Sequence, residues 1–217
     1  MTAPTITITR EIAQTVRDVV DAGLTNGLGE PVPGRMCVEA AVCYALGLPH
    51  GDDPGCVAQS LRSLKIRMND SKWSSETARA TGLRRLAVAQ LGSAGALNER
   101  EFVRRVAEMT IRKAVPIGLR AAAKVNPRHA SVLEAAAVRC EQEGTRTAAG
   151  EAEHIAHSIA YASYVAANAA YAANAANTRD RVLADFAEYV VQILIDMQAP
   201  SCEFLDLVPV VPVVPVL

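Results

Sequence analysis

The sequence predicts an all-α fold on three observations. Residues 151–197 are rich in alanine and contain neither glycine nor proline, which is typical of a long helix. Apolar residues elsewhere recur every three or four positions, the spacing that places them on one helix face. Half of the residues are hydrophobic but only 4% are aromatic, so small aliphatic side chains form the core, which favours closely packed helices. We expect a multi-helix body with a long alanine-rich helix, a short extended N-terminal arm and a proline-containing extended C-terminal tail.

The chain begins with residues 5–9, which alternate threonine with isoleucine and predict a short strand or an extended arm. Residues 10–22 follow as a helix with a valine-rich face, and glycines and prolines mark residues 23–34 as a loop. Residues 35–46 form the next helix. It is apolar nearly all round, which indicates a central position.

The middle of the chain contains helices with recognisable start and stop signals. Asp53 before Pro54 predicts a helix start, with the aspartate as N-cap and the proline at the first helical position. Asn98 and Glu101 have the spacing of a capping box, and Pro116 is expected to kink or end the helix behind them. Other helices are expected from the Ser74-Ser75-Glu76 segment to residue 91, up to residue 125, and over residues 131–143 before Gly144.

The alanine-rich run has two halves. In the first, tyrosines and asparagines between alanine pairs wind around the helix, and the alanines would let another helix approach closely. In the second, from Val182 to Met197, apolar residues form one stripe, with Asn177 or Thr178 as the expected N-cap. One helix of this length would be about 70 Å long, so we expect the run to bend, break or project. Prolines at 209, 212 and 215 favour an extended, polyproline-like tail.

This pattern suggests a helical body over residues 1–128 and an alanine-rich arm with the tail over residues 129–217, as two domains or one continuous domain. Charge is uneven along the chain: residues 57–128 hold 15 Lys and Arg against 5 Asp and Glu, and both flanks are acidic. Acidic and basic faces can attract each other within the fold or across an oligomer. Alternatively, Arg100, Arg104, Arg105 and their neighbours contact nucleic acid or another anionic partner.

The sequence also indicates where the protein acts. We expect no secretion signal and no transmembrane span, because the N-terminus lacks a signal-like apolar segment and no run of about 18 uninterrupted apolar residues occurs. The five cysteines are scattered and odd in number. Free thiols in a reducing cytoplasm are therefore the expectation.

One polar cluster lies within and beside the second helix. Thiolate, imidazole and carboxylate groups close in sequence can bind a metal such as zinc, and a Cys–His pair can serve nucleophilic catalysis. Their spacing matches no established finger or catalytic motif, and turn and cap chemistry explains the loop equally well. The candidate ligand-binding residues are Cys37, Glu39, His50, Asp52, Asp53, Cys56, Asn69 and Asp70.

A second polar set occurs at the start of the alanine-rich run. Glu151 and His154 share a helix face, as do Glu153 and His157. A Glu-x-x-His helix occurs in di-iron bundles, but these need a second such helix and two more carboxylates. No second Glu-x-x-His is present, so solvated helical residues are the better interpretation.

Residues 36–70 resemble an uncharacterised group of bacterial proteins. The shared pattern is a Met-Cys-Val…Glu-Ala segment, a short loop with His or Trp, Asp and Pro before a Cys, and then Asn-Asp. Several members also have an alanine-rich helical C-terminal half. The resemblance implies a bacterial cytoplasmic protein and marks the segment as a unit, but it implies no activity. The matching residues here are Met36, Cys37, Val38, Glu39, Asp53, Pro54, Cys56, Asn69 and Asp70.

The leading functional hypothesis is a non-enzymatic helical assembly or interaction protein, a homo-oligomer or one with a protein partner. It would use the alanine-rich helix and both extended ends as contacts. The alternative is a metal- or small-molecule-binding protein, or an enzyme, with its site around Cys37, His50, Asp53 and Cys56. A nucleic-acid binder is the third hypothesis. The sequence specifies no cofactor and leaves open whether the protein is an enzyme.

Overall fold

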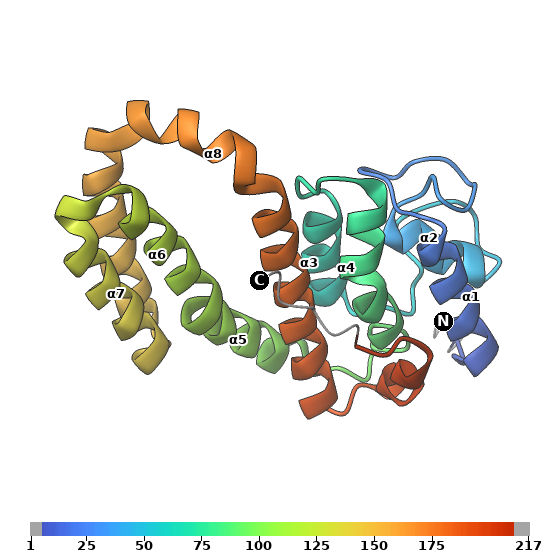
Figure 1. Ribbon diagram of the computed structural model, residues 1–217. Helices are drawn as coiled ribbons and strands as arrows, with labels where there is room; N and C mark the ends of the chain where they lie inside the picture. Colours follow the sequence, from blue (N-terminus) through green and yellow to red (C-terminus); the bar gives the residue numbers. More distant parts are fainter. Residues whose placement is uncertain (1–5, 211–217) are drawn as a thin grey trace. The chain divides into compact units, whose positions relative to one another are not determined.

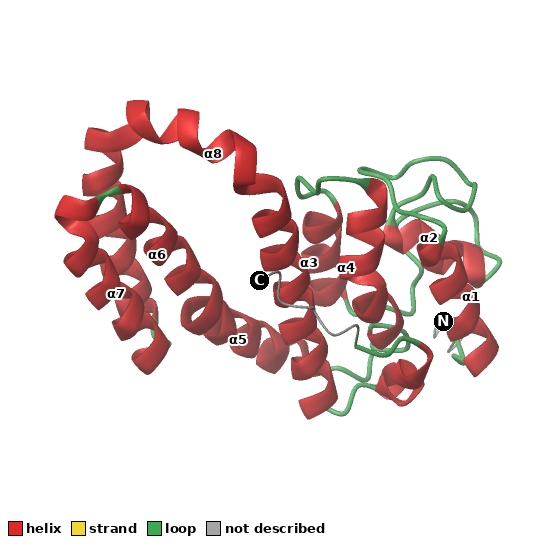
Figure 2. Cartoon of the chain, viewed as in Figure 1, coloured by secondary structure: helices red, strands yellow, loops and turns green. Residues whose placement is uncertain are grey.

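The computed structural model describes residues 6–210, except for the side chains of residues 156–178. Within that part of the chain the protein is all-α, as predicted, with helices joined by loops and no strand (Figures 1 and 2). Among the described residues, one isolated antiparallel β-bridge joins Gly29 and Met36. Among these described residues, no helix has both the length and the apolar character needed to cross a membrane.

The chain folds as two compact units. Unit 1 comprises Met1–Phe102 and Arg179–Leu217, and unit 2 comprises Val103–Thr178. The boundary expected at residue 128 stays a prediction. The chain leaves unit 1 after Phe102 and returns to it at Arg179. One helix, α8 (Arg146–Asp196), contributes to both units.

Unit 1 is built around α4 (Glu76–Ala89), which packs against α1 (Arg10–Asp21), α2 (Val38–Ala45) and the 3₁₀ helix η3 (Pro200–Leu207). Helix α3 (Gln59–Asn69) packs on α2, which is almost entirely buried, as its apolar sequence predicts. The C-terminal part of α8 belongs to the same unit, where Glu188 pairs with Arg85 of α4. The fully buried aliphatic core includes Val16, Val20, Leu24, Val38, Val42, Leu61, Leu83, Leu86, Leu91, Val191 and Leu194.

Helix starts in unit 1 follow their capping residues. The side chains of Thr9 and Ser75 accept hydrogen bonds from the backbone N–H three residues on, which fixes the starts of α1 and α4 near the predicted positions. Helix α2 begins at Val38 rather than at the expected Arg35, because the Cys37 thiol is its N-cap. Asn98 accepts from the Glu101 N–H at 3.1 Å, as the capping-box spacing predicts.

The helix start predicted at Asp53 and Pro54 is wrong. The Asp53 carboxylate accepts from the Gly55 N–H two residues on, and Gly55 has φ +67°, a left-handed conformation that ends the turn. Helix α3 instead begins at Gln59, and the N–H of Ala58 donates to the Ser93 hydroxyl at 2.9 Å. The residue before α3 is therefore bound by a side chain 35 residues away.

Unit 2 contains most of α5 (Glu99–Met109), the π-helical turn η1 (Thr110–Ala114), α6 (Val115–Val125), the short η2 (Pro127–His129), α7 (Ala130–Glu143) and the first part of α8. Pro116 is in the first turn of α6, and the π turn before it accommodates the proline, which confirms the predicted interruption. Gly144 ends α7 with φ +63°. The buried cluster comprises Ile111, Leu119, Leu133, Ala136, Ala137, Cys140, Ala148 and Ala152.

The alanine-rich run and the two ends differ in part from expectation. Helix α8 is unbroken from Arg146 to Asp196, so no second helix begins at residue 177 or 178. The first residues of the expected extended tail, 205–207, are instead part of η3. Three predicted features lie wholly or partly outside the described part. They are the tyrosine and asparagine side chains of residues 156–178, the first residue of the N-terminal arm, and the tail after residue 210.

Candidate functional site

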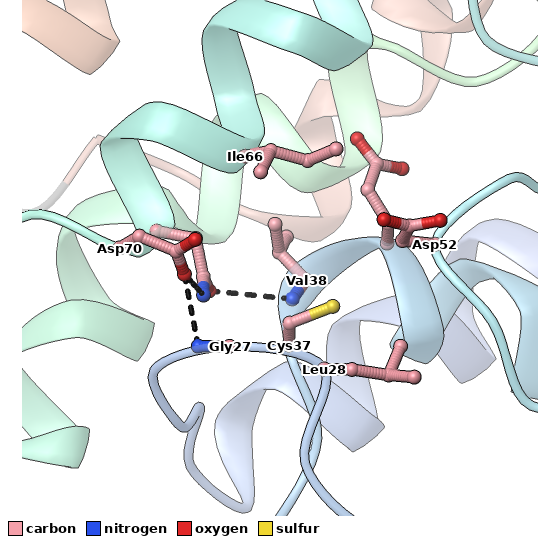
Figure 3. Close-up of a pocket in the computed structure, with 9 residues that line it drawn as sticks. Gly27, Leu28, Cys37, Val38, Asp52, Ile66 and Asp70 are labelled. Carbon is pink, nitrogen blue, oxygen red and sulfur yellow. Dashed lines mark hydrogen bonds between the residues drawn. The ribbon is translucent and has the colours of Figure 1, made fainter.

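A small pocket opens at the start of α2 in unit 1, with a cavity volume of about 60 Å³. Its walls come from the loop after α1, the first residues of α2, the loop after α2 and the last turn of α3 (Figure 3). Polar and apolar side chains both contribute. The lining residues are Gly27, Leu28, Cys37, Val38, Glu39, Asp52, Ile66, Asn69 and Asp70.

Asn69 and Asp70 hold these walls together. The Asn69 amide nitrogen donates to the Thr25 carbonyl at 2.9 Å, and its oxygen accepts from the Val38 N–H at 3.4 Å. The Asp70 carboxylate accepts from the Gly27 N–H at 2.9 Å and from the Asn69 amide at 3.0 Å (Figure 3). The end of α3 therefore fixes both the loop after α1 and the start of α2.

Glu39, in the first turn of α2, forms a fully buried ion pair with Lys65 of α3. Their side chains have 0% exposure, and Lys65 Nζ lies 3.1 Å from Glu39 Oε1. Outside this ion pair, neither group has a hydrogen-bond partner among the described residues. Burial raises the pKa of Glu39 and lowers the pKa of Lys65, while each charge partly opposes the shift of the other. Glu39 lines the pocket, and its buried carboxylate accepts no hydrogen bond from outside the ion pair among the described residues.

The thiols near this pair are protonated at neutral pH. Burial raises the pKa of Cys37 and Cys56, and it raises the pKa of Cys43 to about 11. A thiolate, not a thiol, is the nucleophile and the metal ligand. The Cys37 sulfur also accepts from the Ala40 N–H at 3.4 Å, so this thiol caps a helix. These thiols have the properties of structural cysteines.

The pocket brings together five of the eight predicted site residues, and three lie elsewhere. The His50 ring nitrogen Nε2 is 3.1 Å from the Gly29 carbonyl, a contact that ties two loops together. Asp53 pairs with Arg62 at 2.7 Å and closes the turn at Gly55. Cys56 is buried and does not line the pocket. The five that line it are Cys37, Glu39, Asp52, Asn69 and Asp70.

A metal site is not assembled among the described residues, where no group of three or more His, Cys, Asp or Glu side chains could hold a metal ion. The sequence reasoning that singled out these residue types relied on closeness in the sequence. The fold instead spreads them over separate turns and caps.

Sequence reasoning missed Lys65, although the sequence carries a signal for it. Leu61 and Met68 lie four residues before and three residues after Lys65, so all three share one face of α3. That face is buried, which places a lysine where an aliphatic residue is expected. A lysine at a core position of an amphipathic helix predicts a buried carboxylate partner.

The basic middle of the chain pairs with nearby acidic residues. In unit 2, Arg120 bridges Glu134 and Glu141, with distances of 2.9 and 2.5 Å. Arg112 donates to Glu108 and to three backbone carbonyls at the end of α7, at 2.6, 2.7 and 3.0 Å. These contacts match the expectation that opposite charges attract within the fold.

The Glu-x-x-His set at the start of the alanine-rich run is exposed in its described part. Glu151 pairs with Arg139 of α7, and Glu153 and His154 are exposed. His157 lies outside the described side chains. The arrangement agrees with ordinary solvated helical residues.

Comparison with known proteins found no protein family, no curated protein and no solved structure that matches this chain. The function is therefore argued from the geometry of the site itself.

Proposed function

We propose that the protein binds a small molecule in the pocket at the start of α2. The observation that carries this proposal is the Glu39 carboxylate, which is fully buried, lines the pocket and has an oxygen without any hydrogen-bond partner in the described part of the chain. A buried charged group with unused hydrogen-bonding capacity is costly, and a bound polar group would offset that cost. Such groups with shifted pKa values concentrate at functional sites.

The pocket supports ligand binding rather than catalysis. The nearby thiols have raised pKa values, which disfavours the thiolate that nucleophilic catalysis requires. The only imidazole predicted for the site, His50, contacts a loop carbonyl and does not line the pocket. Recognition of a ligand needs only the shape and the polar groups that the walls supply.

The other two hypotheses stay predictions. The assembly hypothesis depends mainly on side chains of residues 156–178 and on the C-terminal tail, which are outside the described part. The nucleic-acid hypothesis loses support from the basic middle, because Arg104, Arg112 and Arg120 are engaged with acidic residues.

The proposal is tested by two-dimensional NMR of the full-length protein with a panel of small cationic, neutral and anionic compounds of about four non-hydrogen atoms. We expect saturable shifts of the Gly27, Cys37 and Val38 amides with at least one class. Leu28→Trp should abolish them, because Leu28 lines the pocket and is 43% exposed, so a larger side chain fills the space.

The matched control is Val32→Trp, which places the same side chain at a position 47% exposed in the same loop but outside the lining. This variant should bind like the wild type. The absence of saturable shifts with every class, or shifts that persist in Leu28→Trp, would exclude the pocket as a binding site.

A further inference from the structure

We infer that Asn26 is a modification site, at which deamidation to aspartate or isoaspartate is slowed by the carboxylate of Asp70. Neither the reaction nor its control requires a ligand in the pocket. Asn26 is the only asparagine in the sequence that is followed by a glycine, Gly27. Both residues of this pair are exposed, in the loop between α1 and α2. Water, which is the co-reactant, therefore reaches them directly.

Deamidation of an asparagine needs no enzyme, because the atoms that react are neighbours in the chain. The Gly27 nitrogen attacks Cγ of Asn26 and closes a succinimide ring. The Cγ–Nδ2 bond breaks, and the side-chain nitrogen leaves as ammonia, with the proton that the Gly27 nitrogen gives up. Water then opens the ring at either carbonyl, which leaves aspartate or isoaspartate at position 26.

The glycine after the asparagine removes the usual obstacle to this ring closure. A side chain at that position crowds the attacking nitrogen, whereas glycine has no Cβ and a wide choice of backbone angles. Gly27 has φ +67°, and a Cβ added to it would meet no atom within 4 Å. The space around Gly27 is therefore open, and crowding by the fold does not protect the pair.

Asp70 controls the reaction through the Gly27 N–H, which donates to the Asp70 carboxylate at 2.9 Å (Figure 3). To attack, the Gly27 nitrogen must lose this proton and turn toward Cγ of Asn26. The carboxylate opposes both changes, because its negative charge disfavours an amide anion and a charge-assisted hydrogen bond fixes the direction of the N–H. A carboxylate is also far too weak a base to remove an amide proton. The hydrogen bond to Asp70 must therefore break before the ring can close.

The backbone on the other side of Asn26 is fixed as well. The Thr25 carbonyl accepts from the Asn69 amide at 2.9 Å, and the Thr25 N–H donates to the Met36 carbonyl at 3.1 Å. The Asn69 amide also donates to the Asp70 carboxylate at 3.0 Å, which holds that acceptor in place. Asn26 thus lies between two anchored residues. The rotation that brings its side chain onto the next backbone nitrogen requires local opening of the loop.

Deamidation changes the wall of the pocket, because Gly27 is part of its lining. Isoaspartate adds a carbon atom to the main chain just before Gly27, which shifts the N–H away from Asp70. Either product adds a negative charge beside the residue that Asp70 binds. Both changes weaken the contact between this loop and the end of α3.

The first test compares folded and unfolded wild-type protein in isotope-labelled water at neutral pH. Deamidation is measured by mass spectrometry of the peptide that contains Asn26, in which the heavy oxygen marks the product. We expect the folded protein to react at least about tenfold more slowly than the same protein in urea, because a charge-assisted hydrogen bond must break first. Equal rates would overturn the inference. Asn26→Gln is the control for the position, because glutamine closes a larger ring more slowly and should gain no label.

The role of the carboxylate is tested by Asp70→Ala, which removes the acceptor of the Gly27 N–H. Deamidation of the folded variant should be about tenfold faster than that of the folded wild type. The matched control is Asp52→Ala, which removes a carboxylate that lines the same pocket from the loop after α2, and it should leave the rate unchanged. An unchanged rate in Asp70→Ala, or an equal increase in both variants, would contradict the inference.

Hydrogen exchange separates this restraint from a general loss of structure. In Asp70→Ala the Gly27 amide should exchange faster by a factor similar to that of deamidation, while the amides of the buried helix α4 keep their protection. If α4 also loses protection, Asp70→Asn decides the question, because it keeps an oxygen that accepts from Gly27 but lacks the charge. Its rate should lie between those of wild type and the unfolded protein, since a neutral hydrogen bond is weaker. A rate equal to that of wild type would exclude the charge of Asp70 and overturn the inference.

Discussion

The buried ion pair of unit 1 and the exposed ion pairs of unit 2 place opposite charges in contrasting environments. In unit 1, Glu39 and Lys65 form a pair with 0% exposure, and each has a pKa shifted by burial toward its uncharged form. In unit 2, Arg120 and Arg139 pair with glutamates on the surface, where side chains are 38–48% exposed. There the partner raises the pKa of each arginine and lowers the pKa of Glu141 and Glu143.

This contrast concerns what each kind of ion pair contributes to stability. Exposed pairs contribute little to stability, because water solvates the separated groups almost as well. For a buried pair the desolvation cost can exceed the Coulombic gain, and hydrophobic residues of similar volume often stabilise a core equally well. Under the proposed function, the Glu39–Lys65 pair would have a role that hydrophobic residues would not fill, because it would keep a carboxylate beside the pocket.

The largest expected effect is that of Lys65→Met, which leaves Glu39 buried without its partner. The free energy of unfolding should fall by about 3–5 kcal/mol, measured by urea denaturation followed by circular dichroism. In Glu39→Met/Lys65→Met, with both charges replaced, stability should return to within about 1 kcal/mol of wild type or rise above it. A single and a double variant of equal stability would show that the two residues do not act as a pair.

A smaller effect is expected for Arg112→Ala in unit 2, because this arginine serves as the cap of a helix end. Its guanidinium binds three carbonyls at the end of α7 and packs against Gly144, where an added Cβ would lie 2.5 Å from Arg112 Nε. The loss should be about 1–2 kcal/mol by the same denaturation measurement. Glu108→Gln is the control, because it weakens the ion pair but keeps the carbonyl contacts. An equal loss in the control would assign the effect to the ion pair instead.

The smallest effect is expected for Arg120→Gln, which removes two exposed pairs at once. The unfolding midpoint should change no more than the scatter between repeated measurements, and 1 M salt should remove any remaining difference. A clear loss that persists in high salt would show that surface charge contributes to the stability of unit 2, and the contrast between the units would fail.

Local signals predicted much of the fold. The helix starts behind Ser75 and Asn98 and the stop at Gly144 were predicted near their observed positions, because capping depends on residues within one turn. Asp53 and Pro54 form an equally good local signal for a helix start, but the helix begins at Gln59 instead. The reason is not local, since Ser93, far along the chain, binds the N–H at which α3 begins.

The candidate site was predicted in part, because some of its residues are close together in the sequence. Cys37 and Glu39 lie on one short helix, and Asn69 and Asp70 end the next one, so their grouping follows from the sequence. His50 and Asp53 are residue types that can bind a ligand. The conformation of their loop instead places His50 against the Gly29 carbonyl and Asp53 against the Gly55 N–H. Lys65 was missed because its partner is 26 residues away, and only the packing of α3 on α2 brings the two charges together.

By itself the sequence determined the helical class, the capped starts and ends of most helices, and the chemistry of the residues at the start of α2. Periodicity and caps are local properties, so the chain encodes them within a few residues. Only the tertiary structure decided that α8 runs unbroken through two units, that Glu39 meets Lys65 away from water, and that a cavity forms beside them. Those features depend on which helix faces pack against each other, and this choice is made by the whole core at once.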